Sequence, residues 1–138
     1  MTTTYFKNLI MGNVFKTKTS PAIPTSYYIG LSRTAPNVSG GNVSEPSTSG
    51  NGYARVKLDT NVLGTPASGI IKNKEAFAFP ESLLDWFSAS SPATHYVIYD
   101  SATGGNLLMY NTLSASRVIE ANTVATVRAN SLQLQLKD

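Results

Sequence analysis

The side chains that most often carry out catalysis are scarce in this chain. His95 is its single histidine, and cysteine is absent, which excludes a thiolate nucleophile and a zinc–thiolate site. A histidine base needs an orienting acid and a nucleophile within hydrogen-bond reach. Asp100 follows five residues later, at a predicted strand end, and no Gly-x-Ser-x-Gly elbow is present. We therefore interpret His95 as a structural histidine and predict that the protein is not an enzyme.

The eight acidic residues also lack a catalytic or metal-binding pattern. Glu81 and Asp85 are four positions apart and could share one helical face. Glycosidase carboxylates must flank a cleft, usually from different elements, so a solvated helix face is the better interpretation. The chain has no EF-hand loop, although an irregular calcium site in its loops stays open. The glycine pairs 40–41 and 104–105 precede predicted strands rather than helices, so neither indicates a phosphate cradle. We expect no metal and no cofactor.

Two asparagines and several tyrosines offer a different chemistry, the binding of carbohydrate. Asn37 and Asn42 each begin an N-glycosylation sequon, but no secretory signal is recognisable, so we interpret both as chance matches in a polar loop. Tyrosines could stack on sugars, yet on alternating strands about half must face inward. Core packing and protein contacts explain them at least as well. These tyrosines are Tyr27, Tyr28, Tyr53, Tyr96, Tyr99 and Tyr110.

The composition indicates one small β-rich domain. The 138 residues are 41% hydrophobic but only 14% charged, against about 25% in ordinary soluble domains. Serine and threonine fill 31 positions and asparagine 11, a composition that favours strands and turns. No stretch of about 18 apolar residues exists, so we expect no membrane span. The net charge of +3 is too small and too scattered to indicate nucleic-acid binding.

Residues 1–25 differ from the rest and are predicted to form an N-terminal arm or short helix. Phe6 and Ile10 fall on one helical face, and Pro21 and Pro24 end any helix. This segment could pack on its own domain or reach a neighbouring subunit, and the sequence leaves both open. Its three lysines, which precede the first acid of the chain, are Lys7, Lys16 and Lys18.

Residues 26–138 are predicted to form a single antiparallel β-sandwich, or a flattened barrel, of about seven or eight short strands. Turn signals roughly every 8–12 residues are typical of such folds. The strands are expected near residues 26–33, 53–59, 76–79, 94–100, 106–113, 117–119, 123–128 and 132–136.

Three segments of this domain carry more specific expectations. Within 53–59, Ala54, Val56 and Leu58 are predicted to face inward, with Tyr53 outward. After Pro80, residues 81–87 are predicted to form a helical turn whose apolar side chains plug one end of the core. The polar stretch 34–52 exceeds the usual loop length, which indicates a functional or disordered loop.

Several segments, in order along most of the chain, resemble a family of small structural proteins of tailed bacteriophages. One departure is that residues 83–88 lack the Trp-Gly pair usual before the Thr-His strand. The matching segments are Phe6–Phe15, Tyr28–Pro36, Val43–Pro46, Gly52–Val56, Phe79–Ser82, Thr94–Asp100, Gly104–Leu108 and Leu132–Leu136.

The resemblance implies a non-enzymatic component of the virion, assembled in the cytoplasm of the bacterial host. We expect a capsid decoration protein that binds the major capsid protein or tail and neck proteins. The alternative is a protein of a tail or head fibre that adheres to a host surface glycan. A homo-oligomer such as a trimer is expected by analogy, with no nucleic acid and no membrane. The residues predicted to contact partners are Phe6, Lys7, Lys16, Lys18, Asn37, Asn42 and Tyr53.

Overall fold

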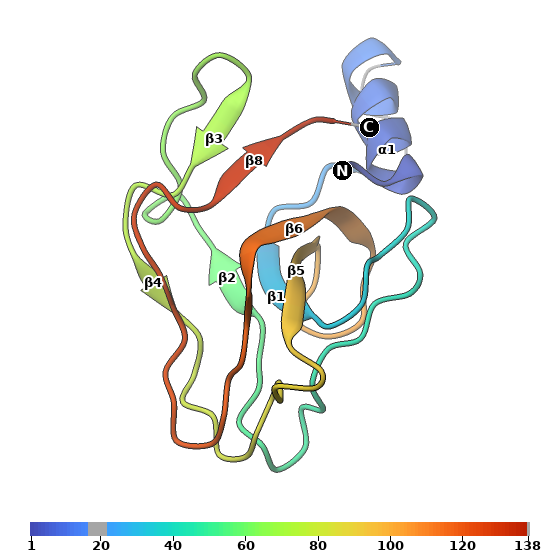
Figure 1. The fold of residues 1–138 in the computed structure, drawn as a ribbon. Coiled ribbons are helices and arrows are strands. Elements are labelled where there is room, and N and C mark those ends of the chain that lie inside the picture. The colour runs from blue at the N-terminus through green and yellow to red at the C-terminus, as the bar shows by residue number, and fades with distance from the viewer. Residues whose placement is uncertain (17–21, 138) are drawn as a thin grey trace.

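The computed structural model describes residues 1–16 and 22–137, and Lys18 therefore lies outside the described residues. The described chain has one helix and eight strands, and every strand pair is antiparallel. The prediction of an antiparallel, β-rich fold is confirmed (Figure 1). The elements are α1 (Thr4–Phe15), β1 (Tyr27–Ser32), β2 (Val56–Leu58), β3 (Ile70–Lys72), β4 (Phe77–Ala78), β5 (Ala93–Tyr99), β6 (Leu107–Arg117), β7 (Thr126–Val127) and β8 (Gln133–Gln135).

A four-stranded sheet in the order β2-β1-β5-β6 forms the centre of the molecule. Ile29 at its middle pairs with Val56 of β2 and with Ile98 of β5. Two further pairs, β3–β8 and β4–β7, form two-stranded ribbons beside it. In the described part of the chain these sheets do not close into a barrel. The sandwich arrangement stays a prediction.

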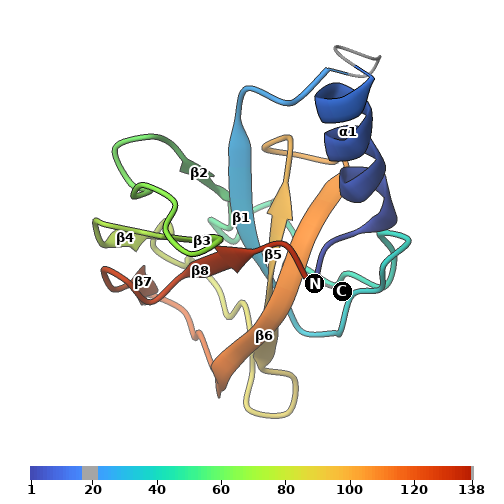
Figure 2. The same ribbon diagram turned by 90° about the horizontal axis from the view of Figure 1, so that it is seen from above.

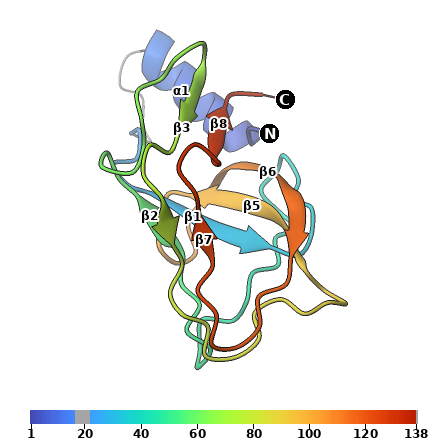
Figure 3. The ribbon, with the colours of Figure 1, turned by 60° about the vertical axis from the view of Figure 1, so that its left-hand side comes forward.

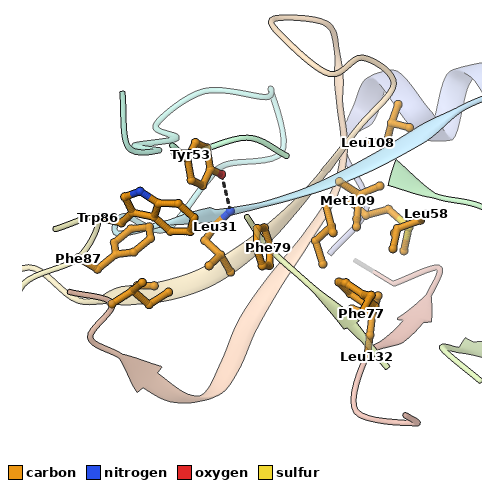
Figure 4. Packing of buried hydrophobic residues seen from close by; sticks show 14 residues of the cluster. Leu31, Tyr53, Leu58, Phe77, Phe79, Trp86, Phe87, Leu108, Met109 and Leu132 are labelled. Carbon is orange, nitrogen blue, oxygen red and sulfur yellow. Dashed lines mark hydrogen bonds between the residues drawn. The ribbon is translucent and has the colours of Figure 1, made fainter. Parts of the chain in front are cut away.

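Both faces of the central sheet are covered, and each face has its own apolar cluster. The larger cluster packs the sheet against the ribbons and extends from Trp86 and Phe87 at one end to Leu58 and Leu108 at the other (Figure 4). The smaller cluster, on the opposite face, is built by Val97, Tyr99, Leu107 and Tyr110. The alternation of side chains along β5 explains this division, since Val97 and Ile98 point to opposite faces.

The long polar loop between β1 and β2 folds over the second face of the sheet. Val43 packs on the smaller apolar cluster, and the Arg33 amide donates to the Ser44 carbonyl at 3.0 Å. The buried Ser32 hydroxyl accepts from the Ser44 amide at 3.0 Å. The loop is therefore held by backbone groups and short polar side chains together with the apolar side chain of Val43.

Residues 1–16 of the N-terminal segment pack on their own domain, as one of the two alternatives from the sequence expects. The Thr3 amide donates to the Leu108 carbonyl at 2.9 Å, and the Thr3 hydroxyl caps α1 by accepting from the Phe6 amide. The Thr2 amide donates to the Lys137 carbonyl at 2.8 Å. Figure 2 shows α1 alongside β6, with the two ends of the chain side by side.

The predicted helical turn over residues 81–87 is wrong. The backbone there bonds to a distant segment instead of to itself: the Ser82 amide donates to the Thr123 carbonyl, and Phe87 forms a bridge with Ile119. These long-range bonds replace the i to i−4 bonds of a helix. Of the four apolar side chains predicted to plug the core, Trp86 and Phe87 are buried, whereas Leu83 and Leu84 are exposed.

The predicted inward and outward faces of residues 53–59 are also wrong at their start. Tyr53 is only 3% exposed, while Ala54 is exposed. The strand begins only at Val56, so the period-2 pattern does not extend back to Tyr53. A hydrogen bond of the Tyr53 hydroxyl to β1 turns its ring into the core.

Candidate functional site

His95 lies on β5, and its imidazole ring is placed between two threonine side chains. Its two ring nitrogens contact the hydroxyls of Thr94, at 2.8 Å, and Thr112, at 3.3 Å. Partial burial lowers the pKa of the ring below its usual value. Across residues 1–16 and 22–137, no group of three or more histidine, aspartate or glutamate side chains could hold a metal ion. Within the same residues, no helix is long and apolar enough to cross a membrane.

A largely buried polar network centres on Arg55. Its guanidinium forms an ion pair with Glu45 at 2.8 Å, and the two side chains are 8% and 16% exposed. The other Glu45 oxygen accepts from the Tyr53 hydroxyl at 2.6 Å, and that hydroxyl accepts from the Leu31 amide at 3.0 Å. Burial and the neighbouring Glu45 carboxylate raise the pKa of the Tyr53 phenol.

Further contacts show that this network is structural. The Arg55 guanidinium lies 3.6 Å from the centre of the Tyr99 ring and donates to the carbonyls of Ser101 and Gly104, at 2.8 Å each. It thereby ties the long loop to the β5–β6 hairpin. Gly30 lies beneath the network, and a Cβ at this position would collide with the Glu45 carboxylate and with the Tyr53 hydroxyl. Glu45, Tyr53 and Arg55 are thus bonded to one another and to backbone groups of β1 and of residues 101–104.

The seven residues predicted to contact partners do not gather in one place. Tyr53 is only 3% exposed and packs in the core of its own chain. Phe6 is half-buried on α1, Lys7 is also half-buried there, and Lys16 is exposed just after the helix. Lys18 lies outside the residues that the structure describes.

Asn37 and Asn42 are exposed, but their side chains shape the long loop. The Asn37 side-chain oxygen accepts from the Gly41 amide at 2.9 Å and from the Ser39 hydroxyl at 2.6 Å. Asn42 has a positive φ of 61° and donates to the Ala35 carbonyl at 2.8 Å. Both sequon asparagines therefore maintain turns.

An apolar groove, which sequence patterns did not indicate, is the feature best suited to bind a partner. It has a volume of about 400 Å³ and lies between α1, the β3–β8 ribbon and the central sheet. Helix α1 contributes Phe6 and Ile10 to its lining, and the ribbon contributes Ile71 and Leu134. The central sheet contributes Tyr27, Leu58, Ile98, Leu108 and Met109. A volume near 400 Å³ falls in the range of binding pockets, about 300–1,000 Å³.

A second hollow of about 310 Å³ adjoins the groove and shares Ile10 and Leu136 with it. Two lysines, Lys7 and Lys137, line this second hollow. We use the name α1–β8 groove for the two hollows together. The groove forms only because the N-terminal helix and the last strand meet, so periodicity within either segment could not have indicated it.

Exposed apolar side chains continue the surface beyond the α1–β8 groove. Leu136 is 59% exposed, and Phe15 at the end of α1 is 71% exposed. Met11 and Val14 lie between them on the outer side of the helix and are also exposed. A contiguous apolar surface of this kind typically marks an interaction site.

The tyrosines do not form an exposed platform. Tyr53, Tyr99 and Tyr110 are buried. The other four are half-buried: Tyr5, Tyr27, Tyr28 and Tyr96. Sugar stacking needs an exposed aromatic face, so this distribution does not favour a carbohydrate site built on tyrosines.

Comparison with known protein families gives a match over nearly the whole chain. The family model described as "Podophage GP4 fiber I protein gp80" matches residues 1–135 of this chain. No curated protein matches. The match spans both α1 and the whole β-rich part, including the residues that line the groove.

Proposed function

This chain belongs to the family of the podophage GP4 fiber I protein gp80 and is thus a structural protein of the virion, and on that premise we propose that it is a non-enzymatic part of a phage fibre or of its attachment. The observation that carries the proposal is the apolar surface of α1 and β8 with the groove between them. A fibre protein binds neighbouring subunits, and apolar surface removed from water supplies the driving force for such contacts.

The proposal differs from the capsid decoration expected from the sequence. The family description names a fibre, which supports the alternative at least as well. Decoration of the capsid stays the competing assignment, and copy number separates the two. Quantitative mass spectrometry of purified particles, with the major capsid protein as reference, should give a small number of copies per particle. A ratio near one to one would assign the protein to the capsid surface, and absence from particles would overturn both.

A surface variant tests whether the apolar surface attaches the protein. Met11 and Phe15 are more than half exposed, so replacing both by serine should leave the fold intact. We expect the Met11→Ser, Phe15→Ser variant to be depleted from particles relative to wild type. Val118→Ser, at an exposed apolar residue just after β6, is the matched control and should be incorporated normally. Equal incorporation of all three proteins would contradict the proposed attachment surface.

A further inference from the structure

Leu83 and Leu84 form an exposed apolar knob that the core does not use. They are 55% and 57% exposed, although the adjacent Trp86 and Phe87 are buried. Two acidic side chains, Glu81 and Asp85, flank the leucines and are also exposed. We use the name Leu83–Leu84 knob for residues 81–85.

The knob is held in a fixed conformation by bonds to two other segments. The Leu83 amide donates to the Asn51 carbonyl at 2.9 Å. The hydroxyl of the buried Ser82 bonds to the carbonyls of Glu120 and Thr123, and Asp85 accepts from the Ala121 amide at 2.8 Å. An exposed side chain on a preorganised backbone loses little further entropy on binding, which favours its use as an anchor.

The knob and the α1–β8 groove lie at opposite ends of the molecule. Figure 3 shows α1, β3 and β8 together at one end and the turns of residues 45–52, 80–88 and 120–124 at the other. The close-up agrees, since Trp86 next to the knob and Leu58 in the groove lie at opposite ends of the core (Figure 4). One copy therefore presents an apolar projection at one end and an apolar hollow at the other.

The charges around the two features are opposite. The knob carries Glu81 and Asp85, whereas Lys7 and Lys137 line the groove end nearest α1. A groove facing a second groove would bring lysines together, and a knob facing a second knob would bring carboxylates together. A knob facing a groove pairs opposite charges, and complementary charges select partner and orientation at interfaces.

We propose that the α1–β8 groove binds the Leu83–Leu84 knob of a second copy of this chain. The contact is head to tail, so each added copy presents a new knob and a new groove. Such heterologous contacts generate a ring when the rotation closes and a filament when it does not. The inference rests on the proposed function in one respect, because it names the partner of the same apolar surface.

The absence of cysteine from the chain allows a direct test by cross-linking. One tagged protein carries Leu84→Cys on the knob, and a differently tagged protein carries Leu136→Cys on the groove. Both positions are more than half exposed, so neither substitution should disturb the core. Under mild oxidation of the mixture, we expect disulfide-linked heterodimers of the two proteins. A chain carrying both substitutions should give a ladder of longer oligomers or closed rings.

The cross-linking outcomes separate the alternatives. Homodimers of the Leu136→Cys protein in preference to heterodimers would indicate a self-facing groove and would overturn the proposal. Val38→Cys, mixed with the Leu136→Cys protein, measures random collision. Heterodimers no more frequent than in that control, both in concentrated solution and in particles containing the variants, would also overturn it.

A charge exchange tests the orientation independently. Surface ion pairs contribute modestly, so Glu81→Lys alone or Lys137→Glu alone should weaken association by about 1.5- to 5-fold, as judged by sedimentation velocity. The two substitutions together should restore association toward the wild-type value. If the double variant is weaker than either single variant, the two residues do not face each other and the proposed contact is wrong.

These results do not depend on whether the proposed function holds. If particles contain the protein but no knob-to-groove cross-link, the head-to-tail contact fails while the virion attachment stands. If cross-links form in purified protein but particles lack it, the self-association stands while the fibre assignment fails.

Discussion

The hydroxyl of Tyr53 provides a sharp test of the buried network, because a single oxygen atom can be removed without changing the shape of the side chain. Strand β2 pairs with β1 only from Tyr27 to Ile29, so the amide of Leu31 has no β2 partner. The Tyr53 hydroxyl accepts that amide at 3.0 Å and donates to Glu45 at 2.6 Å. The variant Tyr53→Phe removes both bonds.

The expected cost follows from these two bonds. A hydrogen bond to a carboxylate contributes about 1.5–3 kcal/mol, and a buried amide left without an acceptor costs about 1–3 kcal/mol. The two effects share one hydroxyl and are not fully additive. We therefore expect Tyr53→Phe to lower the free energy of unfolding by about 2–4 kcal/mol, a large part of the roughly 5–15 kcal/mol typical of a domain.

Urea unfolding monitored by Trp86 fluorescence measures this cost. Trp86 is the single tryptophan, is buried, and packs edge-on against Tyr53 with ring centres 5.2 Å apart. The midpoint should fall while the slope of the transition stays unchanged, because the surface exposed on unfolding is the same. Tyr28→Phe is the matched control: this ring is half-buried on β1, and the described residues provide no hydrogen bond to its hydroxyl.

The control and the variant together decide the role of Tyr53. Tyr28→Phe should change the unfolding free energy by less than about 0.5 kcal/mol. If Tyr53→Phe is equally mild, the hydroxyl does not complete the sheet edge, and the network argument is refuted. If instead Tyr53→Phe leaves stability unchanged but reduces incorporation into particles, the result would support the partner contact that the sequence predicts for Tyr53.

Two further predictions concern a histidine and an asparagine. Burial lowers the folded-state pKa of His95, so the unfolded chain takes up a proton first as the pH falls. The contribution of His95 to stability should be fully present above the pKa of the unfolded chain, about 6.5. It should decrease as the pH falls from there through the folded-state pKa. An NMR titration of the ring should give a folded pKa below 6.5, and a higher value would contradict the burial argument. Asn73 is fully buried, donates to the carbonyls of Glu75 and Arg128, and accepts from the Leu132 amide at 2.9 Å. Asn73→Leu leaves these groups unpaired and should destabilise the protein by about 3 kcal/mol or more, whereas Asn61→Leu, on an exposed loop, should be nearly neutral in the same unfolding assay.

The sequence predicted those elements whose burial follows a local period. The alternation around Ile29 and Leu31 indicated β1, and the alternation of Tyr96 and Ile98 indicated β5. The turn at residues 101–105 indicated the β5–β6 hairpin. The apolar face with Phe6 and Ile10 indicated the N-terminal helix. In each case the pattern of a few neighbouring residues was sufficient. The apolar side chains on one face of a helix or strand recur at the period of that element.

Local pattern failed where a distant segment supplied the hydrogen bonds. Residues 81–87 carry the apolar spacing of a helical turn, yet their backbone bonds to residues 119–123. Tyr53 has the spacing of an outward residue, yet a bond to the Leu31 amide draws it inward. Nothing within either segment specifies these partners, because hydrogen bonds between segments depend on the topology of the whole chain.

The sequence by itself predicted a small, antiparallel, β-rich domain with an N-terminal arm or short helix, because low charge, turn residues and period-2 alternation act locally. Its motifs also indicated a virion protein, in agreement with the family match over residues 1–135. Only the tertiary structure decided which residues form the proposed binding surface. The α1–β8 groove joins residues near both ends of the chain, and the Leu83–Leu84 knob is exposed because its backbone is bound by the segments around Asn51 and Ala121. Surfaces assembled from distant segments depend on how the chain packs, and packing is a property of the folded whole.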